Sequence, residues 1–232
     1  MTPRPLAVEL AWGMAGVHSL SPDCDVLVVV DILSFTTAVS VAVSCGAAVR
    51  PVGAGERLPD LAAGDVVAGP RDGPAPTQSP MSLRELRPGQ RLVLSSPNGA
   101  AIAAALGGVT AVTAALRNAG AVVEWLRTRG GRVGIVAAGE HDDDAFWRPS
   151  YEDALGAGAI AARLGAPCSP QAEAAAVAFR AAEPRLVDCL RDCRSGAELV
   201  QSGFGDDVTM AAELDADAVV PLWRDRVFAA ES

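Results

Sequence analysis

The chain has 232 residues and a net charge of −9 at pH 7, and half of its residues are hydrophobic. That length is enough to bury one sizeable core, while the acidic balance argues against a nucleic-acid-binding protein, which needs a basic surface. All 19 basic residues are arginine, whose guanidinium suits recognition of phosphate, sulfonate or carboxylate groups, so an anionic ligand has to be attracted locally.

Apolar strand-like runs alternate with helix-like segments along the chain. We expect strands at residues 26–30, 48–52, 66–68, 91–94, 110–113, 132–136 and 218–222. We expect helices at residues 36–45, 100–106, 118–129, 151–164, 170–182, 184–193, 195–202 and 206–214. This alternation predicts an α/β fold, with a mostly parallel sheet, helices on both faces and a helical C-terminal third. Residues 1–232 would form a single domain, with a small C-terminal helical lobe from about residue 165 as an alternative.

No apolar stretch in the sequence is long enough to span a membrane, so we expect no membrane partner. The five cysteines are an odd number, and Cys189 and Cys193 have no second Cys or His pair at metal-ligand spacing. We therefore interpret them as reduced thiols of a cytoplasmic protein rather than as a zinc site. The oligomeric state stays open, with a homo-oligomer as one alternative.

Three of the apolar runs end abruptly in polar residues and then lead into a helix-like segment. These residues are Asp31, Ser34, Thr36 and Thr37 at the first junction, Ser95, Ser96, Asn98 and Gly99 at the second, and Glu140, Glu152 and Asp153 at the third. In open α/β sheets, ligands bind just outside the carboxyl ends of the strands, where helix N-termini offer free N–H groups. The pattern favours an enzyme for a small anionic substrate, and it predicts that the junctions share one pocket at the carboxyl edge of the sheet.

The first two junctions also have purely structural explanations. Asp31 is a candidate metal ligand or acid–base group because a buried carboxylate needs a partner, but Asp31 or Ser34 could instead cap the following helix. Asn98 and Gly99 could help to hold phosphate, or they could simply form a tight left-handed turn.

The acidic residues of the third junction allow two interpretations as well. Glu152 and Asp153 fit a Mg²⁺ site, because this ion prefers one or two carboxylates together with water and substrate oxygens. They also fit the first turn of a helix, where the helix dipole alone favours acidic residues. A bound Mg²⁺ would offset the unfavourable negative charge of the protein towards an anionic substrate.

Two irregular loops follow strands and could reach the same rim. Residues 69–80 form a Gly/Pro-rich loop that carries Arg71, and residues 140–149 form an acidic loop that carries Arg148. Either arginine could clamp a substrate, although such loops are as often plain connections. The chain has neither a lysine-containing phosphate loop nor a GxGxxG sequence after a strand, so we expect no nucleotide cofactor.

At these residues the chain resembles the 2-phosphosulfolactate phosphatase family, which consists of Mg²⁺-dependent phosphatases of coenzyme M biosynthesis. The resemblance covers nearly the whole chain. Its motifs are the turn from Asp31 to Thr37, Gly69-Pro-Arg71 with Ser79-Pro80, Pro97-Asn98-Gly99 with Arg117-Asn118, Gly139-Glu140, Glu152-Asp153, and a C-terminal pattern with Ser195-Gly196, Gly203 and Asp206-Asp207-Val208. The resemblance implies an α/β fold, hydrolysis of a phosphate ester and a Mg²⁺ cofactor.

The junctions, the loops and the resemblance together predict the members of the site. We expect Asp31, Glu140 and Asp153 to be catalytic, and Asp31 and Glu152 to hold Mg²⁺, with Glu140 or Asp153 as alternative metal ligands. We expect a small anionic phosphorylated substrate to be bound by Ser34, Thr36, Thr37, Arg71, Asn98, Gly99, Asn118 and Arg148.

Two positions depart from the pattern of the family. An arginine of the family's first turn is Ser34 here, and a glutamate before the loop arginine is Pro70 here. Two functions therefore stay open. One is a Mg²⁺-dependent phosphatase with 2-phosphosulfolactate as its candidate substrate. The other is a catalytically weakened member that binds an anionic metabolite as a sensor or structural partner.

Overall fold

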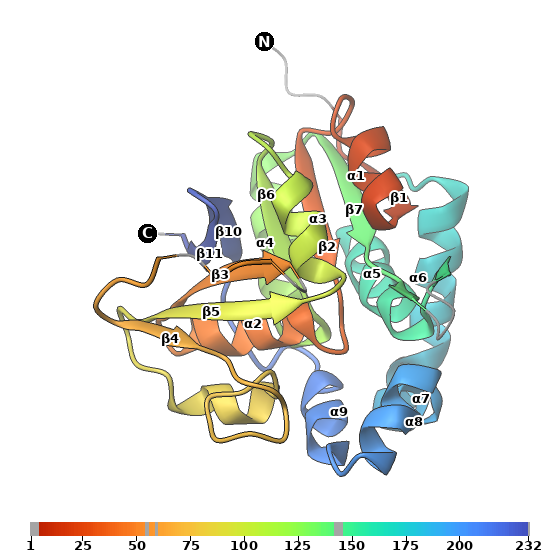
Figure 1. Ribbon diagram of the computed structural model, residues 1–232. Helices are drawn as coiled ribbons and strands as arrows, with labels where there is room; N and C mark the ends of the chain where they lie inside the picture. Colours follow the sequence, from red (N-terminus) through yellow and green to blue (C-terminus); the bar gives the residue numbers. More distant parts are fainter. Residues whose placement is uncertain (1–4, 54–55, 59, 142–145, 232) are drawn as a thin grey trace.

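The computed structural model describes residues 5–53, 56–58, 60–141 and 146–231, and within them the chain forms one nine-stranded sheet covered by helices (Figure 1). In spatial order the strands are β1 (Ala7–Trp12), β7 (Arg132–Ala137), β2 (Val26–Val30), β6 (Ala111–Ala114), β10 (Pro221–Arg224), β11 (Val227–Ala230), β3 (Ala48–Gly53), β5 (Arg91–Ser96) and β4 (Asp65–Val67). A separate two-stranded ribbon consists of β8 (Glu140–His141) and β9 (Trp147–Arg148). The predicted α/β fold with a mostly parallel sheet is confirmed.

The large sheet consists of two parallel groups of strands joined by an antiparallel hairpin. Strands β1, β7, β2 and β6 pair in parallel, and so do β3, β5 and β4. The β10–β11 hairpin between them pairs antiparallel on both sides, so the two groups run in opposite directions. The expectation that all three junctions lie at one carboxyl edge of the sheet is therefore wrong. In Figure 1, β3 and β5 lie across the direction of β2 and β7, and the end of β5 points towards β2.

Both faces of the first strand group are buried, as the run of valines in β2 predicts. Val28 and Val30 pack into one core with apolar residues of α4 (Ala119–Arg129), α5 (Tyr151–Leu164) and α6 (Pro170–Ala182). Leu27 and Val29 pack into a second core, on the opposite face, with α1 (Gly13–Leu20), α2 (Phe35–Ser44) and α3 (Gly99–Ala105). Because side chains alternate along a strand, one short strand serves both cores.

The C-terminal third contains the expected helices, which are α6, α7 (Leu186–Asp192), α8 (Arg194–Gln201) and α9 (Gly205–Ala211). Short 3₁₀ helices are η1 (Pro80–Glu85), η2 (Leu116–Asn118) and η3 (Glu183–Arg185). Among the described residues, every helix is too short or too polar to cross a membrane.

Some expected elements differ from the observed ones. Strand β1 and helix α1 were not predicted; in β1, Glu9 interrupts the apolar run that marks the other strands. The single final strand at 218–222 is wrong, since a hairpin takes its place and begins only at Pro221. The backbone before that residue bonds elsewhere: Asp217 N donates to Arg117 O at 2.8 Å, and Val219 O accepts from Asn118 Nδ2 at 3.1 Å. These bonds keep residues 217–219 out of the sheet.

Candidate active site

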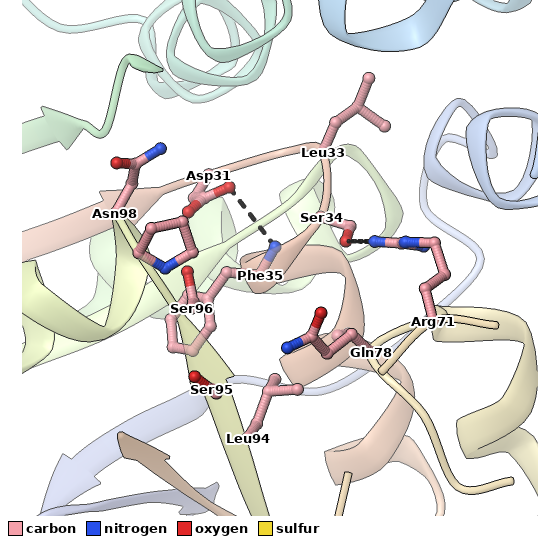
Figure 2. A pocket seen from close by; sticks show the side chains of 12 residues that line it. Asp31, Leu33, Ser34, Phe35, Arg71, Gln78, Leu94, Ser95, Ser96 and Asn98 are labelled. Atoms are coloured by element: carbon pink, nitrogen blue, oxygen red, sulfur yellow. Dashed lines mark hydrogen bonds between the residues drawn. The ribbon is translucent and has the colours of Figure 1, made fainter. Parts of the chain in front are cut away.

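Two adjoining cavities lie where the end of β2 meets the end of β5, and Asp31, Leu33, Pro97 and Asn98 line both. We call the first the cationic cavity; it has a volume of about 130 Å³ and is further lined by Ser34, Arg71, Gln78 and Ser95 (Figure 2). The second, the acidic cavity, has a volume of about 330 Å³ and is further lined by Glu140, Glu152, Asp153, Ser195 and Glu198. Together they offer a small ligand two compartments, one reached by an arginine and the other lined by several carboxylates.

Asp31 occupies the border between the cavities and is held there by the turn that follows β2. Its backbone N–H donates to Thr36 Oγ1 at 3.1 Å, and its carbonyl accepts from the same hydroxyl at 2.8 Å. Burial raises the pKa of Asp31 to about 7, helped by the charge of Glu152 and opposed by the N–H groups of Phe35 and Gly99. A carboxyl with this pKa can take up and release a proton at neutral pH.

The helix-cap explanation applies to Asp31 in part and not to Ser34. Asp31 Oδ1 accepts from Phe35 N at the start of α2, although the distance of 3.4 Å makes the bond weak (Figure 2). The Ser34 side chain makes no capping bond, and its Oγ instead accepts from Arg71 Nη2 at 2.6 Å.

Gly99 joins the two strand groups by close contact rather than by an unusual backbone conformation. A Cβ atom on Gly99 would lie 2.2 Å from Phe35 Cδ1 and 2.7 Å from Asp31 Oδ2. The alternative of a left-handed turn is wrong, since Asn98 has φ −104° and Gly99 is not among the residues with positive φ. Ser96 Oγ accepts from Gly99 N at 3.1 Å and completes this tight turn.

Asp153 connects the ends of two strands. Its Oδ1 accepts from Ile32 N at 2.7 Å and its Oδ2 accepts from Gly139 N at 2.9 Å, so both oxygens already have backbone donors. Burial, together with the charges of Asp31 and Glu152, raises the pKa of Asp153 well above its usual range. Glu152 and Asp153 are only 4% and 3% exposed, so a favourable helix dipole alone does not explain this buried acidic pair.

Glu140 lies at the rim of the acidic cavity and pairs with Arg148 across the β8–β9 ribbon. Ser195 Oγ at the start of α8 donates to Glu140 Oε2 at 2.9 Å. Arg148 is not among the residues that line either cavity, so its guanidinium affects the acidic cavity only through its ion pair with Glu140. Of the acidic loop expected at 140–149, residues 142–145 lie outside the part that the structure describes.

Arg71 reaches the cationic cavity from the predicted loop at 69–80. One terminal nitrogen donates to Ser34 Oγ, and the other forms an ion pair with Asp207 of α9. The guanidinium carbon also lies 5.4 Å from the centre of the Phe204 ring. The loop therefore does carry its arginine to the site.

Of the residues expected to bind substrate, Gly99 and Arg148 line neither cavity, and three more lie buried behind the site. Thr36 bonds to the backbone of Asp31, and Thr37 Oγ1 donates to Ile32 O at 2.8 Å. Asn118 Oδ1 accepts from Ala115 N at 2.8 Å, while its Nδ2 donates to Val219 O. All of these side chains are fully buried, so their contacts stabilise the turns behind the site.

Several lining residues were not singled out from the sequence. Gln78, Glu198 and His141 line the cavities, but no motif in the sequence marks them. His141 Nδ1 lies 3.1 Å from Asn98 Oδ1. Ser195 and Asp207 do belong to the C-terminal pattern of the family resemblance. That pattern could have marked them, but it assigned them no role.

The two expected metal ligands, Asp31 and Glu152, face the same acidic cavity. Among the described residues, no group of three or more His, Cys, Asp or Glu side chains has an arrangement that could hold a metal ion. A Mg²⁺ ion can nevertheless bind through one or two carboxylates when water and substrate supply its other ligands.

Comparisons with known proteins agree with the resemblance seen in the sequence. Residues 16–226 match the family model described as 2-phosphosulpholactate phosphatase. A protein of Gloeobacter violaceus named probable 2-phosphosulfolactate phosphatase is 30% identical over 217 residues, which cover 87% of this chain and 88% of the relative. Relatives with the same name from a Synechococcus strain and from Symbiobacterium thermophilum are 34% and 32% identical, over 86% and 85% of this chain and 88% and 91% of theirs.

Proposed function

This chain belongs to the 2-phosphosulfolactate phosphatase family, a family of phosphoric monoester hydrolases, and we propose from that premise that it hydrolyses a small phosphoester that carries a second anionic group. The candidate substrate is 2-phosphosulfolactate. One observation carries the proposal: Asp31, with a pKa of about 7, lies on the border between an acidic and a cationic cavity. The phosphoryl group would lie beside the acids, and the second anion beside Arg71.

Mg²⁺ is part of the proposal, with Asp31 and Glu152 as its protein ligands. The donor set fits, since both are buried carboxylates that face one cavity, and no arginine lines that cavity among the residues that the structure describes. When bound, the ion would polarise the phosphoryl oxygens and offset the charge of the acidic cavity. Asp153 is a weaker candidate ligand, because both of its oxygens accept backbone hydrogen bonds.

The remaining residues have separable proposed tasks. Asp31 would accept a proton from the attacking water, because a bound Mg²⁺ would lower its pKa from the raised metal-free value and keep the carboxylate ionised. Asn98 lines both cavities and would orient the substrate between them. Glu140, fixed by Arg148 and Ser195, would close the far side of the acidic cavity.

We place this enzyme in the cytoplasm, since its five cysteines are free thiols and disulfides rarely persist in a reducing compartment.

A second function is favoured by a specific observation. Arg71 and Arg148 are each paired with a carboxylate of the protein itself, Asp207 and Glu140, which reduces the positive charge available to a substrate. A catalytically weakened member would bind an anionic metabolite without hydrolysing it.

The experiment that separates the two functions measures release of inorganic phosphate from a panel of small phosphoesters. The panel includes 2-phosphosulfolactate, and each assay is run with Mg²⁺ and with excess chelator. We expect release with Mg²⁺ and none with chelator. Full activity in chelator would exclude Mg²⁺ dependence, and binding of 2-phosphosulfolactate without release under either condition would favour the sensor.

A further inference from the structure

We propose that Asp207 is a positioning residue that holds the Arg71 guanidinium in place for the second anion of the ligand. The assignment deepens the proposed function and rests on it in taking the ligand to carry a further anionic group besides its phosphate. Asp207 lies in the first turn of α9, far along the chain from the strand ends that build the acidic cavity.

Asp207 bonds both to Arg71, which lines the cationic cavity, and to the loop and 3₁₀ helix that follow Arg71 in the chain. Its Oδ2 pairs with Arg71 Nη1, and its Oδ1 accepts from Ser79 Oγ and, at 3.3 Å, from Met81 N. The Asp207 side chain is 2% exposed, whereas that of Arg71 is 19% exposed and lines the cavity. The buried carboxylate therefore fixes one end of an arginine whose other side faces the ligand space.

Two further contacts restrict the orientation of Arg71. Ser34 Oγ accepts from Nη2 at 2.6 Å, and the Phe204 ring lies 5.4 Å from the guanidinium carbon. A guanidinium has five N–H donors in a rigid fork, so bonds to Asp207 and Ser34 leave further donors for an anion. An arginine held in advance loses less conformational entropy when the ligand binds.

Substitution of Asp207 by asparagine separates this role from a purely structural one. The amide oxygen can replace Oδ1 and keep the bonds from Ser79 and Met81. Its NH₂ group then faces the N–H donors of Arg71, and two donors repel each other. Asp207→Asn should thus leave the loop in place and displace the guanidinium.

The test measures binding of sulfoacetate, an unreactive dianion, by calorimetry, so it does not depend on catalysis. We expect Asp207→Asn to weaken binding about tenfold or more, the loss typical of a charge-assisted hydrogen bond. Asp206→Asn is the matched control, because this exposed neighbour has the same charge and lies in the same helical turn. Ser79→Ala removes a loop contact but not the ion pair. Both controls should bind within about twofold of the wild type, the range expected for side chains that make no ligand contact.

A double-mutant cycle completes the test. In an Arg71→Gln background, Asp207→Asn should weaken binding by less than about twofold, because its effect acts through Arg71. If the asparagine variant does not fold, Asp207→Ser serves in its place with the same expected loss. Unchanged binding in the Asp207 variant, additive losses in the cycle, or no sulfoacetate binding by the wild type would each overturn the assignment. Binding that depends on Arg71 and Asp207 in a protein without phosphatase activity would refute the proposed function and leave this inference intact.

Discussion

The two cavities that meet at Asp31 are constructed in different ways. The buried carboxylates of the acidic cavity are held at strand ends, where Asp153 accepts hydrogen bonds from the backbone N–H groups of Ile32 after β2 and Gly139 after β7. The cationic cavity depends on side-chain contacts between distant segments, since Arg71 and Asp207 are 136 residues apart in the chain. The first is determined by the core of the sheet, whereas the second can change through single substitutions such as those at positions 34 and 70.

This difference suggests that the two cavities contribute separately to catalysis and to substrate recognition. Buried carboxylates on a rigid sheet suit the reacting group, because their geometry is fixed by the backbone. An arginine on a loop suits the group that distinguishes one substrate from another. We therefore expect substitutions in the acidic cavity to affect turnover, and those in the cationic cavity to affect substrate choice.

The largest effect should come from Asp31→Asn, which removes the proposed acid–base group but keeps the size of the side chain. We expect kcat/KM for phosphate release to fall at least about a hundredfold. The thermal midpoint at pH 8 should not fall, because the substitution also removes a charge whose burial is unfavourable. A variant with more than a tenth of wild-type kcat/KM would show that Asp31 is not essential.

The same substitution gives a prediction for stability as a function of pH, measured by chemical denaturation in chelator. Burial raises the pKa of Asp31 from 3.8 to about 7 in the folded state. Between these values the folded carboxyl holds a proton that the unfolded chain has released, so stability falls as pH rises through this window. Above about pH 7 the contribution is constant. Asp31→Asn should make the wild-type decline shallower, and an identical slope in both proteins would contradict the raised pKa.

Gly99→Ala tests the close contact that joins the two strand groups beside the cavities. The added Cβ would meet Phe35 and Asp31 closer than atoms normally approach, so we expect a loss of about 1–3 kcal/mol in unfolding free energy and lower activity. This outweighs the gain in helix propensity of up to about 1 kcal/mol. Gly108→Ala is the control, since nothing lies within 4 Å of its added Cβ. Equal stability of the two variants would refute the close contact.

Ser34→Arg tests whether the cationic cavity still has room for the arginine of the family. The new side chain would meet the guanidinium of Arg71, which already bonds to Ser34 Oγ at 2.6 Å. We expect repulsion between the two cations, a lower melting temperature and no gain in affinity for 2-phosphosulfolactate. Combining it with Arg71→Gln should relieve this repulsion. Tighter binding by the single variant at an unchanged melting temperature would show that the cavity is open to a second arginine.

Asn118→Ala should have the smallest effect on catalysis. Asn118 is fully buried and bonds to Ala115 N and Val219 O, so its loss should cost about 1–3 kcal/mol of stability with KM changed less than about twofold. Asn98→Ala provides the opposite case, because Asn98 lines both cavities. Assays of both variants should show stability lost in one and activity lost in the other.

The sequence allowed prediction of those features that arise from short-range patterns. The valine run of β2 predicted a strand buried on both faces. The abrupt polar ends of the strands predicted the cavity positions of Asp31, Asn98 and Glu152, but not which of their polar neighbours turn away from the cavities. The contacts of Thr36 and Asn118 could not be predicted, because a buried hydroxyl or amide has the same sequence signal whether it bonds to backbone or to a ligand. The opposite directions of the two strand groups arise because the β10–β11 hairpin inserts between β6 and β3. This pairing joins segments far apart in the chain, so no local sequence pattern predicts it.

The most direct test of one site with two cavities compares two substrates in the wild-type protein. With Mg²⁺, we would measure kcat/KM for 2-phosphosulfolactate and for 2-propyl phosphate, which has the same carbon skeleton without the carboxylate and sulfonate. A contact between Arg71 and the second anion predicts at least about a tenfold preference for 2-phosphosulfolactate. Equal values for the two substrates, or no phosphate release from either, would contradict it.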